Sequence, residues 1–212
     1  MIQETHVSTF TEAEELKADW RRLWGRSHQS DSKPLSYWSI DDSKRGGVAI
    51  LLHPSVVDQV SPWLQERWTR RVIAIKMRER TLVNVYAPNS HEEREQFFGR
   101  LQAWPWEACE TIVAGDFNCV LSPVIDRLGG HRTGRPESAA LPDLLRQLQL
   151  EDTCILAGQT GDGADKLENT EYFTYWGPEA ASRIDRFYVP ASWTAKVQWL
   201  SVLEPTTPSD HQ

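Results

Sequence analysis

The sequence has no long apolar run and few cysteines. None of its hydrophobic stretches approaches the roughly 20 residues that a membrane-spanning helix needs, and residues 1–4 show no basic segment leading into an apolar one. Cys109, Cys119 and Cys154 are odd in number, widely spaced and form no CxxC pair. We therefore expect a soluble protein in a reducing compartment, without an export signal, a disulfide framework or a zinc cluster.

Positive charge is also scarce. The chain has 23 lysine and arginine residues against 30 aspartate and glutamate residues, which gives a formal net charge of −7. This balance opposes non-specific attraction to a polyanion and argues against a module that simply coats nucleic acid. It is compatible with an enzyme acting on phosphates, because clustered carboxylates can hold a divalent cation that then meets the phosphate. Local basic contacts, or ordinary solvated surface, would come from Arg67, Arg70, Arg71, Arg132 and Arg135.

Length and apolar spacing predict one domain, residues 1–212, with three helices. A chain of 212 residues that is 40% hydrophobic is long enough for one sizeable core and too short for two. The first helix runs from about Thr11 to Trp24, with Thr11 and Glu14 in capping-box spacing, and the second begins at Ser90. The apolar faces of the three helices are predicted to be core and consist of Leu16, Trp20, Leu23 and Trp24, then Phe97, Phe98 and Leu101, then Leu141, Leu144, Leu145 and Leu148.

Short β-rich runs lie between these helices. They are residues 47–52, 72–76, 81–86, 111–114, 184–189 and 197–203. The runs 72–76 and 81–86 are close enough to form a hairpin, whereas other strands are separated by helices. Residues 157–171, with three glycines and several acidic residues, are predicted to be a surface loop. The mixture predicts an α/β (α+β) fold with stacked mixed sheets.

A buried-type strand at residues 111–118 ends in an acid and an amide, Asp116 and Asn118. If the chain is extended here, the two side chains point the same way. Aspartate and asparagine are also common turn residues, so a plain turn is an equally good interpretation of this segment taken alone.

A second carboxylate stands in the run 182–189. Two-residue alternation places Asp185 on the same face as Phe187 and Val189, an apolar side. An ionised carboxylate buried without a partner is costly, so Asp185 should have one. In a purely structural interpretation the partner is Arg183 or Arg186. In a catalytic interpretation Asp185 orients an imidazole.

Two further segments could contribute polar groups to a site. His211, which follows Ser209 and Asp210, could supply the imidazole, although a histidine near a chain end is usually without function. In residues 84–89, Asn84 and Tyr86 face opposite to the valines between them. Tyrosine and asparagine at a strand end beside a proline turn could donate to phosphate oxygens, and an ordinary strand is an equally good interpretation.

Taken together, these segments resemble the ordered motifs of the endonuclease/exonuclease/phosphatase family over essentially the whole chain. The motifs are residues 3–6, 84–89, 115–118, 182–188 and 209–211. Residues 45–51 (Arg-Gly-Gly-Val-Ala-Ile-Leu) and 182–186 (Ser-Arg-Ile-Asp-Arg) resemble endonuclease domains of LINE-type (non-LTR) retrotransposons more than DNA-repair enzymes or inositol phosphatases. The resemblance implies a four-layer α/β sandwich, in which two mixed β-sheets pack face to face with helices outside.

The resemblance also implies a site for Mg²⁺ or Mn²⁺. Glu4, Asp116 and Asp210 would be the metal ligands, since hard cations prefer carboxylate oxygens. His211 would face the scissile phosphate and be oriented by Asp185. Asp116 would also position or deprotonate the attacking water of an in-line displacement at phosphorus.

The remaining implied contacts are with the substrate. Asn118 would hold the phosphate or the pentavalent intermediate, and Tyr86 with Asn89 would add hydrogen bonds to phosphate oxygens. The implied substrate is DNA, nicked to prime reverse transcription by a reverse transcriptase domain encoded elsewhere. This activity would place the protein inside the cell, in the nucleus.

Two other functions remain open. One is an inositol-phosphate or sphingomyelin-type phosphoesterase of the same family, and the other is a catalytically dead fragment of a retroelement. The family normally begins with a strand that carries an asparagine ahead of the Gln-Glu motif, and it continues past Ser-Asp-His into a closing strand. We therefore expect the first and last core strands to be missing from residues 1–212, which would expose sheet edges.

Overall fold

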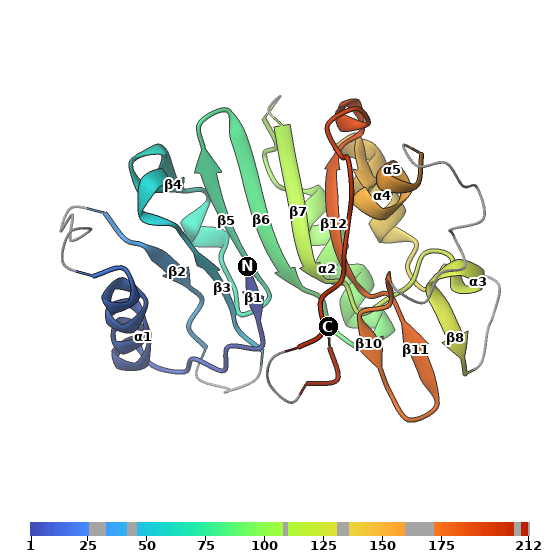
Figure 1. The fold of residues 1–212 in the computed structure, drawn as a ribbon, viewed down its shortest axis with the longest axis horizontal. Coiled ribbons are helices and arrows are strands. Elements are labelled where there is room, and N and C mark those ends of the chain that lie inside the picture. Colours follow the sequence, from blue (N-terminus) through green and yellow to red (C-terminus); the bar gives the residue numbers. More distant parts are fainter. Residues whose placement is uncertain are drawn as a thin grey trace. The chain divides into compact units, whose positions relative to one another are not determined.

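The computed structural model describes residues 1–25, 33–41, 46–107, 110–130, 136–159, 172–205 and 209–211 (Figure 1). They contain helices and mixed β-sheets, which is the fold class that the sequence predicted. The chain divides into two compact units. Unit 1 is Met1–Tyr86 with Cys109–Gly115, and unit 2 is Ala87–Ala108 with Asp116–Gln212. No helix in these ranges is both long and apolar enough to cross a membrane.

Unit 1 contains two groups of strands. The first is an antiparallel sheet in the order β1-β3-β2, formed by β1 (Ile2–Gln3), β3 (Val48–Leu51) and β2 (Ser36–Trp38). The second has the order β4-β5-β6-β7 and consists of β4 (Val60–Pro62), β5 (Val72–Met77), β6 (Arg80–Tyr86) and β7 (Glu110–Asp116), whose last residue belongs to unit 2. The predicted hairpin is confirmed, because β5 and β6 pair antiparallel with Val72 opposite Val85.

The two sheets of unit 1 pack against each other around an apolar core (Figure 1). Ile50, Ile73 and Ile75 belong to this core, where almost no surface remains exposed. Asn84 on β6 is also fully buried, as are the valines on either side of it in the sequence. Its amide donates to the carbonyls of Ile2 and Ala49 at 2.9 Å and thereby links the sheets.

Helix α1 (Phe10–Leu23) lies against β2 in unit 1 (Figure 1). It begins at the capping box of Thr9 and Glu12, two residues earlier than the predicted pair, Thr11 and Glu14. Leu23 is 76% exposed, so its assignment to the apolar face is wrong. Two short 3₁₀ helices, η2 (Pro54–Gln59) and η3 (Gln65–Arg67), connect strands of this unit.

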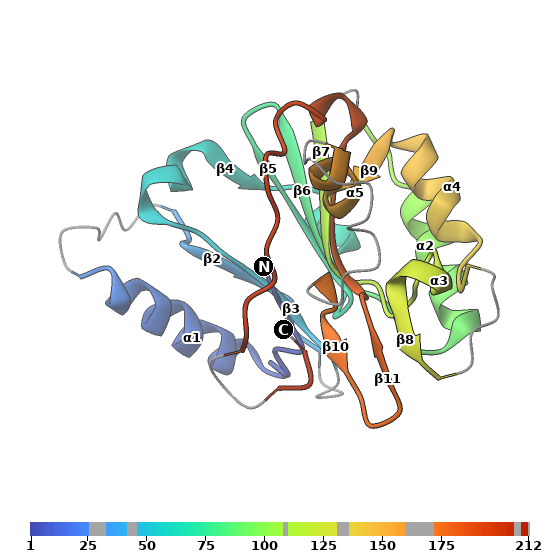
Figure 2. The same cartoon turned by 45° about the vertical axis from the view of Figure 1, so that its right-hand side comes forward.

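The described residues of unit 2 form two small groups of strands and four α-helices. Strands β12 (Asp185–Pro190) and β9 (Leu150–Asp152) pair antiparallel, and a second sheet has the order β10-β11-β8, formed by β10 (Tyr175–Trp176), β11 (Ala180–Ser182) and β8 (Arg127–Gly129). The helices are α2 (His91–Gln102), α3 (Pro123–Asp126), α4 (Ala140–Gln147) and α5 (Thr153–Gln159), followed later by the 3₁₀ helix η6 (Ala191–Trp193). Helices α2 and α4 pack side by side (Figure 2).

The core of unit 2 is rich in aromatic side chains. Phe117 stacks on Phe98 of α2 and makes an edge contact with Tyr188 of β12, at centroid distances of 6.2 and 4.9 Å. Helix α2 starts after Ser90 as predicted, and its Phe97, Phe98 and Leu101 are buried. The predicted core leucines of α4 are also buried up to Leu145.

Three strand and loop predictions for unit 2 are corrected. Residues 197–203 form no strand, and Trp199 and Leu203 are exposed, because no other described segment pairs with them. On β12 the buried side chains are Arg186, Tyr188 and Val189, whereas Phe187 is 52% exposed, so the predicted apolar face is wrong. The predicted loop 157–171 begins inside α5, and residues 160–171 lie outside the described part of the chain.

Asn84→Ala should lower the free energy of unfolding by about 2 kcal/mol, because it removes the hydrogen bonds of the buried Asn84 amide to the Ile2 and Ala49 carbonyls and from the Gln3 amide. Urea titration followed by tryptophan fluorescence measures this loss. Asn89→Ala is the matched control, since Asn89 is exposed and should change stability by less than about 0.5 kcal/mol. Equal stabilities of the two variants would contradict the sheet-linking role.

Candidate active site

Two carboxylates and an imidazole come together in unit 2. Asp116, Asp185 and His211 each offer a ligand atom, and these atoms lie within 4.8 Å of one another. Asp116 ends β7 and Asp185 begins β12. His211 is held by a β-bridge to Tyr175 of β10, whose ring packs against the imidazole at a centroid distance of 5.3 Å. Three segments distant in sequence therefore meet at one point.

His211 is oriented by Asp185. The imidazole Nδ1 lies 2.9 Å from Asp185 Oδ2, so the predicted pair forms, and the alternative partners Arg183 and Arg186 contact other carboxylates. The hydrogen bond to Asp185 raises the pKa of His211 to about 9; burial opposes this rise, and the charges of Asp185, Asp116 and Asp210 add to it. Because Nδ1 is hydrogen-bonded to the Asp185 carboxylate, Nε2 is the nitrogen that can form a hydrogen bond with a substrate.

Asp116 is 3% exposed and fixed by a turn. The Asn118 backbone N–H donates to Asp116 Oδ1 at 2.7 Å, and the Asn118 side-chain amide donates to Oδ2 at 3.0 Å and to the Ala87 carbonyl at 2.8 Å. Asn118 has a φ of 48°, so the expected extended geometry is wrong and the turn interpretation holds. Both amide hydrogens of Asn118 are thus engaged within the protein.

Glu4 and Tyr86 meet in unit 1. The Tyr86 hydroxyl donates to Glu4 Oε1, and the Glu4 side chain remains 54% exposed. His6 Nε2 lies 3.9 Å from the other Glu4 oxygen. The Tyr86 ring is covered by the Arg71 guanidinium, whose carbon lies 4.5 Å from the ring centroid. Glu4 therefore presents a carboxylate to solvent from a fixed position.

Residues 1–211 match the Endonuclease/Exonuclease/phosphatase family. The chain belongs to this family. A comparison with curated proteins gives no match.

Solved structures agree on the family fold at low sequence identity. An AP endonuclease from Archaeoglobus fulgidus is 15% identical, with a TM-score of 0.61, over 91% of this chain and 76% of that one. A 3'-5' exonuclease (NExo) from Neisseria meningitidis is 20% identical, with a TM-score of 0.52, over 76% of this chain and 68% of that one. A 3' phosphatase NExo from Neisseria, bound to product DNA hairpin, is 20% identical, with a TM-score of 0.56, over 86% and 81%. These similarities establish the sandwich fold of the family.

Other predicted site residues of this family member lie at the surface. Asn89 is exposed and its carbonyl accepts a hydrogen bond from Arg94, while Asp210 is exposed and its carbonyl accepts from the Trp176 N–H. The carboxylate of Asp210 does not belong to the three-residue ligand group of unit 2.

Among the candidate basic residues, Arg70 pairs with Asp41 and Arg71 covers Tyr86. Four residues that were named from the sequence lie outside the described ranges: Arg45, Cys109, Arg132 and Arg135.

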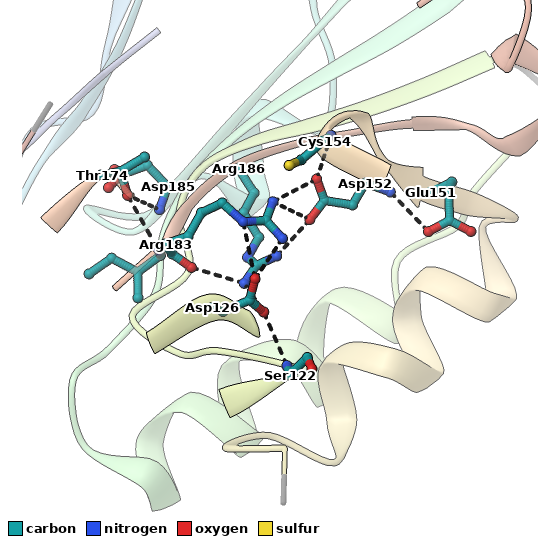
Figure 3. Close-up of polar contacts among 10 residues, drawn as sticks. Ser122, Asp126, Glu151, Asp152, Cys154, Thr174, Arg183, Asp185 and Arg186 are labelled. Atoms are coloured by element: carbon teal, nitrogen blue, oxygen red, sulfur yellow. Dashed lines mark hydrogen bonds and ion pairs between the residues drawn. The ribbon is translucent and has the colours of Figure 1, made fainter. Parts of the chain in front are cut away.

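Sequence reasoning missed a group of four buried, ion-paired side chains next to Asp185, of which it had named only the two arginines, as alternative partners of Asp185 (Figure 3). They are Arg183, Arg186, Asp126 and Asp152, which form ion pairs of 2.6 to 2.7 Å. It also missed Thr174, whose hydroxyl oxygen accepts from the backbone N–H of Asp185 at 3.0 Å. A signal was present, because two arginines at strand-like positions in an apolar run require buried acidic partners.

Within the group of Asp116, Asp185 and His211, the buried carboxylate of Asp116 fits a divalent cation, whereas Asp185 and the imidazole are committed to each other. Carboxylate oxygens suit Mg²⁺ and Mn²⁺. A bound cation would lower the pKa of a coordinated water and offset charge on a phosphate. Glu4, which faces solvent from unit 1, is the further carboxylate of the predicted set.

Gly115→Ala should lower the free energy of unfolding by at least about 2 kcal/mol, because Gly115 has a φ of 135° and an added Cβ would lie 2.0 Å from the Val85 carbonyl oxygen. Thermal unfolding of the two proteins measures the change. Gly99→Ala in α2 is the control, since a Cβ there meets nothing within 4 Å and alanine favours the helix. A Gly115→Ala protein as stable as the wild type would contradict this geometry.

Proposed function

We propose that the chain is a divalent-metal-dependent phosphodiesterase that nicks DNA. The observation that carries the proposal is the convergence of Asp116, Asp185 and His211, in the family whose motifs the sequence carries over residues 1–211. A buried carboxylate and a carboxylate-bound imidazole are groups that can catalyse hydrolysis of a phosphodiester. One can accept a proton from water, and the other can donate to the phosphate.

His211 acts as the donor to the phosphate in this proposal. Its raised pKa keeps the imidazole protonated near neutral pH, so Nε2–H can stabilise the charge that develops on the phosphoryl oxygens. Asp185 accepts the Nδ1–H and fixes the ring plane. Asp116 positions the attacking water or removes its proton.

Asn118 has a different proposed role from the one that the motif suggests. Its two amide hydrogens donate to Asp116 and to the Ala87 carbonyl, so they are not available to a phosphate oxygen in this state. We propose that Asn118 positions Asp116 by fixing both of its oxygens. Direct contacts with the substrate would then come from Tyr86 and Asn89, as expected from the motif.

From the sequence motifs, we propose Glu4, Asp116 and Asp210 as carboxylate ligands for Mg²⁺ or Mn²⁺. The cation would supply charge neutralisation at the phosphate. Glu4 is exposed enough to change partners, and its release from the Tyr86 hydroxyl would free that hydroxyl to donate to a phosphate oxygen. The Arg71 guanidinium above the Tyr86 ring provides positive charge beside the same hydroxyl-bearing ring.

DNA is the proposed substrate class. The similar solved structures are named as an AP endonuclease, a 3'-5' exonuclease and a 3' phosphatase bound to a DNA hairpin, which supports this choice. Within it, we propose a nicking role in retrotransposition, with a reverse transcriptase domain encoded elsewhere as partner and the nucleus as the place of action. Residues 45–51 and 182–186 support this finer assignment by their likeness to LINE-type endonucleases.

Processing of DNA 3' ends is the second candidate, because two of the similar structures act there by their names. The two activities separate in one experiment. Supercoiled plasmid and a 3'-phosphorylated hairpin are each incubated with the protein, with and without Mg²⁺. Relaxation of the plasmid supports the nicking endonuclease, release of phosphate supports end processing, and inactivity on both supports a catalytically dead fragment.

His211→Ala and Asp116→Asn should each lower metal-dependent DNA cleavage by roughly 100-fold to 1,000-fold, because each removes a group that meets charge in the transition state. Initial rates of plasmid nicking measure the loss. Asp143→Asn is the control, since Asp143 belongs to an exposed i,i+3 ion pair and should retain full activity. Nicking at the wild-type rate by either site variant would refute the assignment.

Glu4→Gln and Asp116→Asn should weaken Mn²⁺ binding, because each substitution replaces a charged oxygen ligand by a neutral amide. Isothermal titration calorimetry in the absence of DNA measures the affinity directly. Glu14→Gln, which changes a surface carboxylate of α1, should bind Mn²⁺ as the wild type does. Unchanged binding by Glu4→Gln would remove Glu4 from the ligand set while leaving Asp116 in it.

A further inference from the structure

Four charged side chains of unit 2 are buried together beside the segment that carries Asp185 (Figure 3). Arg183 contacts Asp126 Oδ1 and Asp152 Oδ2, each at 2.7 Å. Arg186 contacts Asp126 Oδ2 at 2.7 Å and Asp152 Oδ2 at 2.6 Å. Each arginine thus binds both carboxylates, and the four groups, termed here the ion-pair ring, close on themselves.

All four members of the ion-pair ring are charged. Burial opposes ionisation of Asp126, yet the charges of Arg186 and Arg183 lower its pKa below the ordinary value. Burial likewise opposes the charged form of Arg183, and the two aspartates raise its pKa. The ring is therefore neutral overall, with two charges of each sign.

Stability alone is a poor explanation for the ion-pair ring. The cost of desolvating four ions offsets most of their attraction, and an apolar cluster of similar volume is often at least as stable. Within the described residues, the buried Arg186 Nε also lacks a hydrogen-bond partner. Planar guanidinium groups instead fix the relative orientation of the paired side chains, because the N–H groups of a guanidinium fit a carboxylate in only a few orientations.

The ion-pair ring is tied to the backbone of Arg183, two residues before Asp185. The Arg183 N–H donates to the Asp126 carbonyl at 2.9 Å, and Arg186 Nη2 donates to the Arg183 carbonyl at 2.9 Å. At the next residue, the Ile184 carbonyl accepts from the N–H of Phe117 at 2.9 Å, and Phe117 is the residue after Asp116. The segment is therefore held at consecutive peptide groups and joined to the turn that carries Asp116.

We propose that Arg183, Arg186, Asp126 and Asp152 are positioning residues for the Asp185–His211 pair. The ion-pair ring fixes the backbone of residues 183–186, so that the Asp185 carboxylate stays aimed at the imidazole and the imidazole stays within reach of Asp116. A catalytic group that is misplaced by about 1 Å can lose 100-fold in rate, which gives the ring a function beyond folding. This inference rests on the proposed phosphodiesterase function and adds residues that the motifs leave unassigned.

Arg183→Lys tests the proposal because it keeps the charge and loses the fork. We expect kcat on a labelled DNA duplex to fall about 10-fold to 100-fold with KM nearly unchanged, below the temperature at which unfolding begins. Asp152→Asn breaks the ring from β9 and should give the same pattern if Arg183→Lys folds poorly. Arg146→Lys alters an exposed ion pair of the same unit and should keep the wild-type kcat.

A double-mutant cycle shows whether Arg183 acts through Asp185. In a background of Asp185→Asn, Arg183→Lys should reduce kcat by less than about 2-fold, because the pair that it positions is already broken. A general structural role predicts the same factor in both backgrounds. Equal factors, or no loss of kcat in any folded ring variant, would overturn the proposal.

A readout without metal or substrate separates this inference from the proposed function. The Nδ1 proton of His211, bonded to Asp185, should give a downfield NMR resonance that Asp185→Asn abolishes. Arg183→Lys and Asp152→Asn should shift or broaden it, and Arg146→Lys should leave it in place. If the wild type hydrolyses no DNA and the resonance still responds in this way, only the proposed function fails. A resonance unmoved in both ring variants would reject the positioning role.

Discussion

A buried charge must be bonded, and unit 2 meets this constraint at four buried or half-buried aspartates in and beside the candidate site. Asp116 is bonded by the Asn118 turn, Asp185 by His211, and Asp126 and Asp152 by the two arginines. Each bond removes a desolvation cost and at the same time fixes a direction. The requirements of burial therefore create the aligned groups on which the proposed chemistry depends.

The same constraint explains which parts of the site could be predicted. Alternation along residues 182–189 showed that Asp185 needed a partner, and the order of the family motifs supplied His211. The alternative of Arg183 or Arg186 failed because their carboxylate partners, Asp126 and Asp152, lie 57 and 31 residues from Arg183. No local pattern reports a partner at such a distance. Two-residue alternation also gave the wrong face of β12, since the charge of Arg186 is balanced by Asp126 and Asp152 and its side chain is therefore buried.

Local structure was predicted well where the apolar residues follow one regular spacing. It was predicted poorly where an unusual backbone conformation or the pairing of strands determines the structure. The hairpin of β5 and β6 and the buried faces of α2 and α4 follow from simple spacing. Asn118 adopts a positive φ that could not be predicted from the sequence. This conformation is stabilised by hydrogen bonds from Asn118 to Asp116 and to the Ala87 carbonyl. Residues 197–203 have strand-like composition without a strand, since β structure needs a partner and composition cannot supply one.

The acidic balance of the chain has a specific consequence for how it would engage DNA. The ion-pair ring is neutral, so the formal charge of −7 belongs to the rest of the chain. A divalent cation and the protonated His211 would together change this to about −4, which still repels a polyanion at long range. Recognition would then depend on short-range contacts, where a cation and a protonated imidazole act within a few ångströms and screening by salt is weak. On this argument, misaligning His211 by loosening the ion-pair ring would harm the chemistry far more than the encounter, because the encounter owes little to the charge of the protein.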